Sequence, residues 1–234
     1  MLADRLLKLV TSVSLDGIAL PKGVRVLDPL RSENSAEVAR IVRDFHRKYF
    51  GDDRPRTLML GINPGRLGAG STGLCFTDTK RCESDLGIPV PGFRTHEPSS
   101  DFFYRVVRAM GGAKDFYSDV YVQAICPLGF TKAGPKGSPV NLNYYDDRAL
   151  QEALTPFVIG WMKKLIATGT RTDNVFCIGT GKNLAYLEAL NNDHHFFERI
   201  TALEHPRFIM QYKAKGVDDY VRKYVDALNG ASMK

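Results

Sequence analysis

Four short apolar segments punctuate this chain, and loops and helix-type segments separate them. They cover residues 57–62, 120–125, 175–178 and 200–203. Short continuous apolar runs bounded by Gly, Pro and Asn predict buried strands. Strands that alternate with helices are typical of an open parallel sheet covered by helices. We therefore expect an α/β fold with four parallel strands.

Helical periodicity marks the segments between these strands. We expect helices over residues 3–15, 34–49, 99–110, 148–168, 182–190 and 217–228. Asn34 and Glu37 have the spacing of a capping box, and Ser99 or Ser100 is expected to cap the helix that follows. Residues 17–30 are predicted to be a loop that contains at most a short strand.

The chain is long enough to bury one large core. It has 234 residues, of which 44% are hydrophobic. A single domain over residues 1–234 is the economical interpretation, with residues 1–56 supplying N-terminal helices that pack on the sheet.

Charge and composition narrow the class of protein. The formal net charge of +6 is compatible with a nucleic-acid partner. No apolar run is long enough to cross a bilayer, and no secretion signal is evident, so we expect a cytoplasmic protein. The four cysteines lack zinc-type spacing and are expected to be reduced thiols.

Loops that follow the strands are expected to carry the function. Ligands of parallel α/β sheets bind outside the carboxyl ends of the strands. Three loops leave these ends here, at residues 63–98, 126–147 and 205–216. Residues 179–182 read Gly-Thr-Gly-Lys, but the positions that a phosphate loop requires are Phe176 and Asn183, so that motif is rejected.

The first loop contains a recognisable motif. Residues 61–76 read GINPGRLGAGSTGLCF, residues 126–128 read CPL, and residues 205–206 read HP. In this order and spacing they resemble the uracil-DNA glycosylase superfamily, most closely its single-strand-selective monofunctional (SMUG-type) branch.

The resemblance implies a three-layer α/β/α sandwich with a central four-stranded parallel sheet. It implies hydrolysis of the bond between a base and deoxyribose in DNA, without a metal or other cofactor. Asn63 would hold the attacking water, and His205 would donate a hydrogen bond to the base carbonyl. Because an amide cannot accept the proton of water at neutral pH, we expect a slower enzyme than the branches with Asp at this place.

Further residues are expected to contact the DNA. The residues predicted to bind the base, with Phe76 as the stacking platform, are Gly61, Ile62, Phe76, Gly73 and Asn143. Within residues 205–216, Arg207 and Phe208 are predicted to wedge into the duplex, and Lys213 and Lys215 to meet phosphates. The sequence leaves open the alternative that Phe208, Ile209 and Met210 are core residues that continue a strand.

One departure from the family concerns base choice. Family members usually have an Asn two residues before the CPL element, but this chain has Ala124 there. Because Ala cannot hydrogen bond through its side chain, we expect backbone groups, Gln123, Asn141 or Asn143 to replace that Asn. Relaxed base choice, extending to deaminated purines, is a hypothesis that follows.

Three alternatives stay open. The chain could belong to the mismatch-specific uracil/thymine branch, which shares the GINPG motif but not His205-Pro206. It could be a DNA-binding module of the same fold without catalysis, or a nucleotide-binding α/β protein. We expect a monomer that acts on DNA, whereas the preferred lesion and the strand preference are not determined by the sequence.

Overall fold

A parallel sheet of four strands forms the centre of the computed structural model, which describes residues 1–135 and 137–232. The strands are β2 (Thr57–Gly61), β3 (Val120–Ala124), β6 (Val175–Ile178) and β7 (Ile200–Leu203), in the order β3-β2-β6-β7. All neighbouring pairs are parallel. Every residue of β2 and β6 is buried, which explains their continuous apolar sequences. The predicted strand positions and the parallel arrangement are confirmed.

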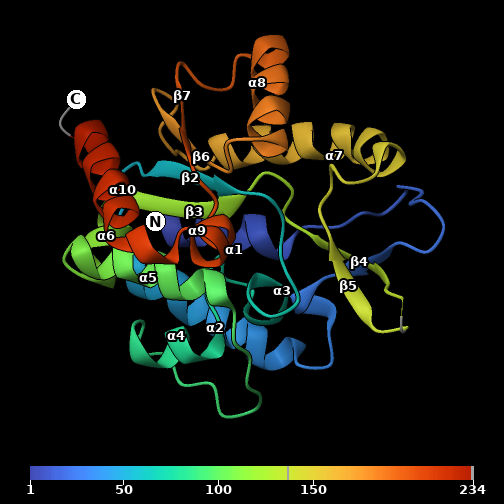
Figure 1. Cartoon of the computed structure of the whole chain (residues 1–234), viewed down its shortest axis with the longest axis horizontal. Helices are drawn as coiled ribbons and strands as arrows, with labels where there is room; N and C mark the ends of the chain where they lie inside the picture. Colours follow the sequence, from blue (N-terminus) through green and yellow to red (C-terminus); the bar gives the residue numbers. More distant parts are fainter. Residues whose placement is uncertain (136, 233–234) are drawn as a thin grey trace.

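Helices cover both faces of the sheet. The longer helices are α1 (Leu2–Thr11), α2 (Ser35–Tyr49), α5 (Pro98–Ala109), α7 (Arg148–Ile166), α8 (Lys182–His194) and α10 (Val217–Ser232). Figure 1 shows α7 and α8 on one side of the sheet and α2 and α5 on the other. The α/β/α sandwich is therefore confirmed. Pro156 lies inside α7.

The predicted helix caps are wrong, and the structure gives the reason for each. Asn34 precedes α2 but makes no side-chain cap, since its backbone (φ −96°, ψ +16°) is not in the extended conformation of an N-cap, and Glu37 pairs with Arg40 instead of turning back. Ser99 and Ser100 lie inside the first turn of α5, which begins with a proline. The hydroxyl of Ser100 donates to Asp78 at 2.8 Å rather than capping its own helix.

Several elements were missing from the sequence interpretation. They are β4 (Gly129–Ala133), β5 (Pro139–Leu142), α3 (Ala69–Thr72), α4 (Thr79–Ser84), α6 (Ala113–Asp119), α9 (Pro206–Tyr212), and the short 3-10 turns η1 (Pro29–Arg31) and η2 (Ala214–Gly216). The short strand that the sequence allowed within residues 17–30 is β1 (Arg25–Leu27). Strands β1, β4 and β5 form a separate antiparallel sheet. Residues of β1 and β5 are largely exposed, and the buried residues of β4 are consecutive, so none of the three strands has the apolar alternation that predicts a strand.

No described helix is long and apolar enough to span a membrane. Among the described residues, no group of three or more His, Cys, Asp or Glu side chains is arranged to hold a metal ion.

The turn after α3 depends on a glycine. Gly73 has a φ of +75°, and a Cβ there would lie 2.6 Å from a methyl group of Val42. Alanine would be strained both in its backbone and against α2. We expect Gly73→Ala to lower the free energy of unfolding by about 1–3 kcal/mol, measured by urea denaturation.

A matched control exists in α7. A Cβ at Gly160 would meet no atom within 4 Å. Gly160→Ala should therefore leave stability unchanged or raise it by about 0.5–1 kcal/mol, as expected inside a helix. Equal effects of the two substitutions would contradict the role assigned to Gly73.

Candidate active site

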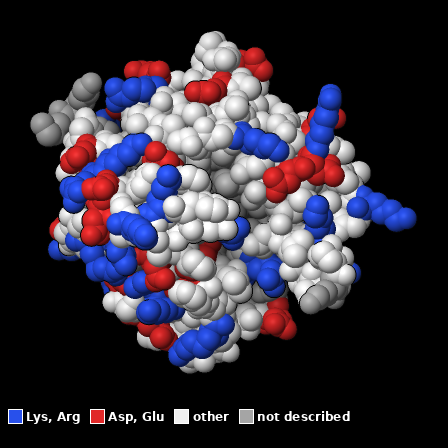
Figure 2. All heavy atoms as spheres, in the orientation of Figure 1, with Lys and Arg blue, Asp and Glu red and all other residues white. Residues whose placement is uncertain are grey.

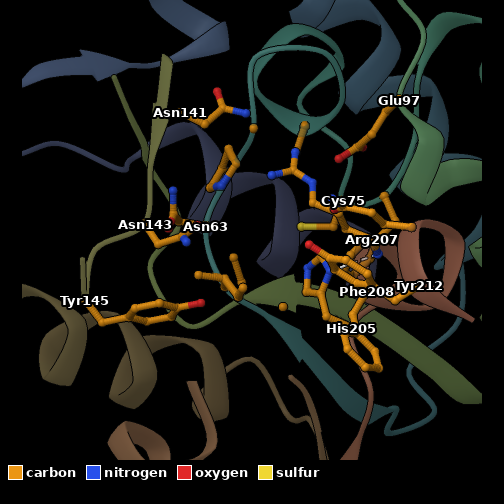
Figure 3. Close-up of a pocket in the computed structure, with 18 residues that line it drawn as sticks. Asn63, Cys75, Glu97, Asn141, Asn143, Tyr145, His205, Arg207, Phe208 and Tyr212 are labelled. Carbon is orange, nitrogen blue, oxygen red and sulfur yellow. Dashed lines mark hydrogen bonds between the residues drawn. The ribbon is translucent and has the colours of Figure 1, made fainter. Parts of the chain in front are cut away.

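A cavity of about 270 Å³ lies at the carboxyl ends of β2 and β3, next to the start of α9. Most of the residues predicted for the site line it, namely Gly61, Ile62, Asn63, Phe76, Asn143, His205, Arg207 and Phe208. The sequence analysis assigned no role to several other lining residues, namely Ala69, Cys75, Glu97, Tyr145, Gln211 and Tyr212. Gly73, Lys213 and Lys215 are not part of the lining. Figure 3 shows Asn63 and Glu97 entering the cavity from opposite sides.

Two hydrogen bonds to the end of β5 fix the side chain of Asn63. Its Nδ2 donates to the carbonyl of Leu142 at 3.3 Å, and its Oδ1 accepts from the amide N–H of Tyr144 at 3.1 Å. A side-chain amide has two donor hydrogens and two acceptor lone pairs. One of each therefore remains for a water molecule or a ligand in the cavity.

His205 is held as a neutral hydrogen-bond donor. It is the N-cap residue of α9, and its Nδ1 accepts from the main-chain N–H of Arg207 at 3.1 Å. Burial, together with the positive charge of Arg207, lowers the pKa of His205 to about 4. At neutral pH the ring therefore carries its single proton on Nε2.

Phe76 is a preformed aromatic wall. Its ring stacks on Phe103 with centroids 5.2 Å apart and lies 5.6 Å from the ring of His205. A Cβ at Gly61 would come within 3.1 Å of this ring, so the glycine allows the close approach. Phe76 also has a φ of +52°, an unfavourable conformation for a bulky residue. Such strain is often found at functional sites, where the surrounding structure holds it in place.

Glu97 contributes a carboxyl group that the sequence did not indicate. Glu97 is the residue before α5, and its side chain lines the cavity. Its main-chain N–H donates to the carboxylate of Asp78 at 2.9 Å. A Cβ at residue 68 would lie 1.8 Å from Oε2 of Glu97, so Gly68 makes room for the carboxyl group. Burial raises the pKa of Glu97 to about 7, with Arg207 opposing and Asp78 adding to the shift.

The segment after His205 is a helix, so both its prediction as a loop and the alternative of a strand are wrong. Pro206 occupies the first helical position and His205 the cap, which are favourable starts for a helix. Ile209 is buried, whereas Phe208 and Tyr212 are exposed one turn apart with ring centroids 5.5 Å from each other. Arg207 and these two rings border the cavity.

The three predicted residues that do not line the cavity are close in sequence to residues that do, but their side chains or backbone lie elsewhere. Gly73 ends α3 and packs against α2. Lys213 ends α9, and Lys215 lies in η2. Contacts of these two lysines with DNA phosphates stay a prediction.

Among the side chains considered as replacements for the missing Asn at position 124, two line the cavity, and backbone groups stay a further alternative. Gln123 is occupied by the hydroxyl of Tyr121, to which its Nε2 donates at 3.0 Å, and it does not line the cavity. Asn141 and Asn143 both line it. The Oδ1 of Asn141 accepts from the N–H of Arg66 at 3.1 Å, which leaves its amide nitrogen available.

The protonation state of His205 can be measured directly. We expect ¹⁵N–¹H spectra of the histidine rings to show His205 neutral, with its proton on Nε2, from pH 8 down to about pH 4. His46, which is fully buried, has its pKa lowered to about 4 as well, so His205→Gln is needed to assign the signals. Titration of His205 near pH 6.5 would contradict the structure.

Comparisons with known proteins relate the chain to one family. The family model of the uracil DNA glycosylase superfamily matches residues 48–229. No curated protein matched. Among solved structures, the crystal structure of wild-type Pedobacter heparinus SMUG2 is similar over the whole chain. It has 42% sequence identity and a TM-score of 0.96, and the match covers 100% of this chain and 99% of that one. The chain therefore belongs to the uracil DNA glycosylase superfamily.

Proposed function

We propose that this protein is a monofunctional DNA glycosylase that hydrolyses the N-glycosidic bond of uracil or a related damaged base flipped out of DNA. One observation carries the proposal, namely that Asn63, Phe76 and a neutral His205 face the same cavity at the carboxyl edge of the sheet. A water-holding amide, an aromatic platform and a hydrogen-bond donor are the groups that such a reaction requires.

The base must leave the DNA stack before its bond to the sugar can be reached. Phe103 supports one face of Phe76, so the other face is available to a planar base in the cavity. Stacking of a base on an aromatic ring is worth about 1–3 kcal/mol, which partly offsets the cost of extraction.

His205 stabilises the departing base. As the C1′–N bond breaks, its electron pair leaves with the base, and negative charge grows on the base carbonyl oxygens. The Nε2–H of neutral His205 is a preorganised donor for such an oxygen. One donor of this kind is worth about 2.7–4 kcal/mol in the transition state.

Asn63 positions the nucleophile. Its remaining donor and acceptor can orient a water molecule whose oxygen bonds to C1′, while that water releases a proton. The bonds from Asn63 to Leu142 and Tyr144 hold the amide in place before substrate arrives. The products are a free base and an abasic site.

Helix α9 and the start of α8 are the expected DNA-binding elements. Arg207, Phe208 and Tyr212 surround the cavity mouth and are placed to fill the space left by an extracted base. A second depression of about 230 Å³ joins His205 and Phe208 to residues 179–183 at the start of α8, where free N–H groups suit a phosphate. Figure 2 shows a hollow near the centre of this face, with Lys and Arg side chains at several points around it.

Substitution of the two catalytic candidates, Asn63 and His205, tests the proposed reaction. On an oligonucleotide with a single uracil, we expect His205→Ala to lower the single-turnover rate by about 10²–10³, because one donor to the base is lost. Asn63→Ala should lower it at least as far, since no other described side chain is assigned to the water. Alkali-labile strand breaks are the measurement, on single- and double-stranded DNA.

Surface residues of the same types provide the controls. Asn192→Ala and His194→Ala change exposed side chains on α8 and should cleave like the wild type. A wild type that binds uracil-containing DNA without producing alkali-labile sites would favour a binding module and reject the glycosylase.

The second prediction concerns base choice. Ala124 lines the cavity, and Asn there would narrow it and add an amide for the pyrimidine edge. We expect the wild type to cleave uracil and at least one of xanthine and hypoxanthine, and Ala124→Asn to shift the ratio of rates towards uracil. Strict preference of the wild type for uracil would contradict relaxed base choice.

A further inference from the structure

Glu97 lies in the same cavity as Asn63 and His205, yet the reaction described above leaves it without a role. Its Oε2 is buried, and no described residue of the chain donates a hydrogen bond to it. Buried polar atoms in folded proteins almost always have a partner, so each exception calls for an explanation. Figure 3 shows the Glu97 side chain extending towards the open part of the cavity.

The position of the carboxyl group is built into the fold. Asp78, itself fully buried, anchors the backbone of Glu97 by accepting its N–H and also caps α4 through the N–H of Arg81. Gly68 provides the space that the carboxyl group occupies. These contacts hold the carboxyl group at the cavity wall, and none of them brings a cation next to it.

An ionised Glu97 would oppose the proposed reaction. Negative charge develops on the base as it leaves, and the phosphates of bound DNA add more. A bound base also removes water from the cavity and so further disfavours a carboxylate. A protonated carboxyl group, in contrast, has an O–H donor for the base.

Resting on the function proposed above, we propose that Glu97 is a further catalytic residue that, as a neutral carboxylic acid, donates a hydrogen bond to the extracted base. It would share the stabilisation of the departing base with His205. No proton is transferred in this step, because the O–H remains on the carboxyl oxygen.

Charged and titratable groups around Glu97 support this assignment. Arg207 on α9 lowers its pKa, whereas Asp78 at the start of α4 and above all burial raise it, to about 7. Of the other lining residues, His205 has its pKa near 4, and Cys75 and Tyr145 near 12. A change of rate close to neutral pH would thus coincide with the ionisation of Glu97.

The test compares pH profiles of single-turnover cleavage of a uracil-containing oligonucleotide between pH 5.5 and 8.5. The wild-type rate should be constant at low pH and fall about tenfold per pH unit once Glu97 ionises. Glu97→Gln keeps an N–H donor at every pH, so its profile should be flat and exceed that of the wild type at pH 8.5. Glu97→Ala should be slow and flat, and the exposed control Glu188→Gln should match the wild type.

Proton uptake gives an independent measurement. With Asn63→Ala as the slow background, binding enthalpies at pH 7.5 in two buffers of different ionisation enthalpy should reveal net proton uptake. Uptake should be absent when Glu97→Gln is added to this background.

Stability provides a check on folding. Because the unfolded carboxyl has the lower pKa, Glu97 destabilises the fold as pH rises from about 4.5 to about 7. Glu97→Gln should therefore melt no lower than the wild type at pH 8.

The outcomes separate the two proposals. An active wild type whose pH profile is unchanged by Glu97→Gln would overturn the role of Glu97 and leave the glycosylase intact. A change in KM alone, with an unchanged profile, would also overturn it and indicate that Glu97 only holds Arg207. A wild type without any cleavage would overturn both.

Discussion

The main-chain ladder between β2 and β3 continues past both strands, and the site depends on it. After the last paired residues, the N–H of Ile125 donates to Gly61 at 3.0 Å and the N–H of Cys126 donates to Ile62 at 3.1 Å. These bonds fix where the chain leaves the sheet. They therefore also fix the position of Asn63, which is the next residue. The absence of a side chain at Gly61 then lets Phe76 approach the strand end. Backbone pairing thus places the ring of Phe76 and the amide of Asn63 relative to each other.

The central sheet and the meeting of Asn63 and His205 in one cavity could be predicted from the sequence, because the signals for them are local. Buried parallel strands such as β6 are continuous apolar runs, and the residues after them are recognisable by order and spacing. The helix α9 could have been found from Pro206 and its cap His205, but the apolar run 208–210 suggested a strand. This run is too short for its periodicity to distinguish a helix from a strand.

The antiparallel sheet and Glu97 could not be predicted, for a different reason. Strand β5 buries only its last residue, and β4 buries consecutive residues, so their sequences carry little of the alternation that marks a strand. Yet this hairpin supplies the carbonyl of Leu142 and the N–H of Tyr144 that hold Asn63. Glu97 precedes a proline at the start of a helix, where a glutamate is usually solvent-exposed. Only the long-range contacts with Gly68 and Asp78 direct the side chain of Glu97 into the cavity.

Three polar groups of the cavity are uncharged, two of them because they are buried. It keeps His205 uncharged, and it favours the neutral form of Glu97. Asn63 carries no charge at any pH. A cationic histidine would bind the phosphates of DNA and the released anionic base more tightly, and so would stabilise the bound substrate and the product as well as the transition state. Neutral donors interact weakly with a neutral base and more strongly as its negative charge grows. In the proposed reaction, the interactions of this cavity are therefore strongest where the glycosidic bond would break.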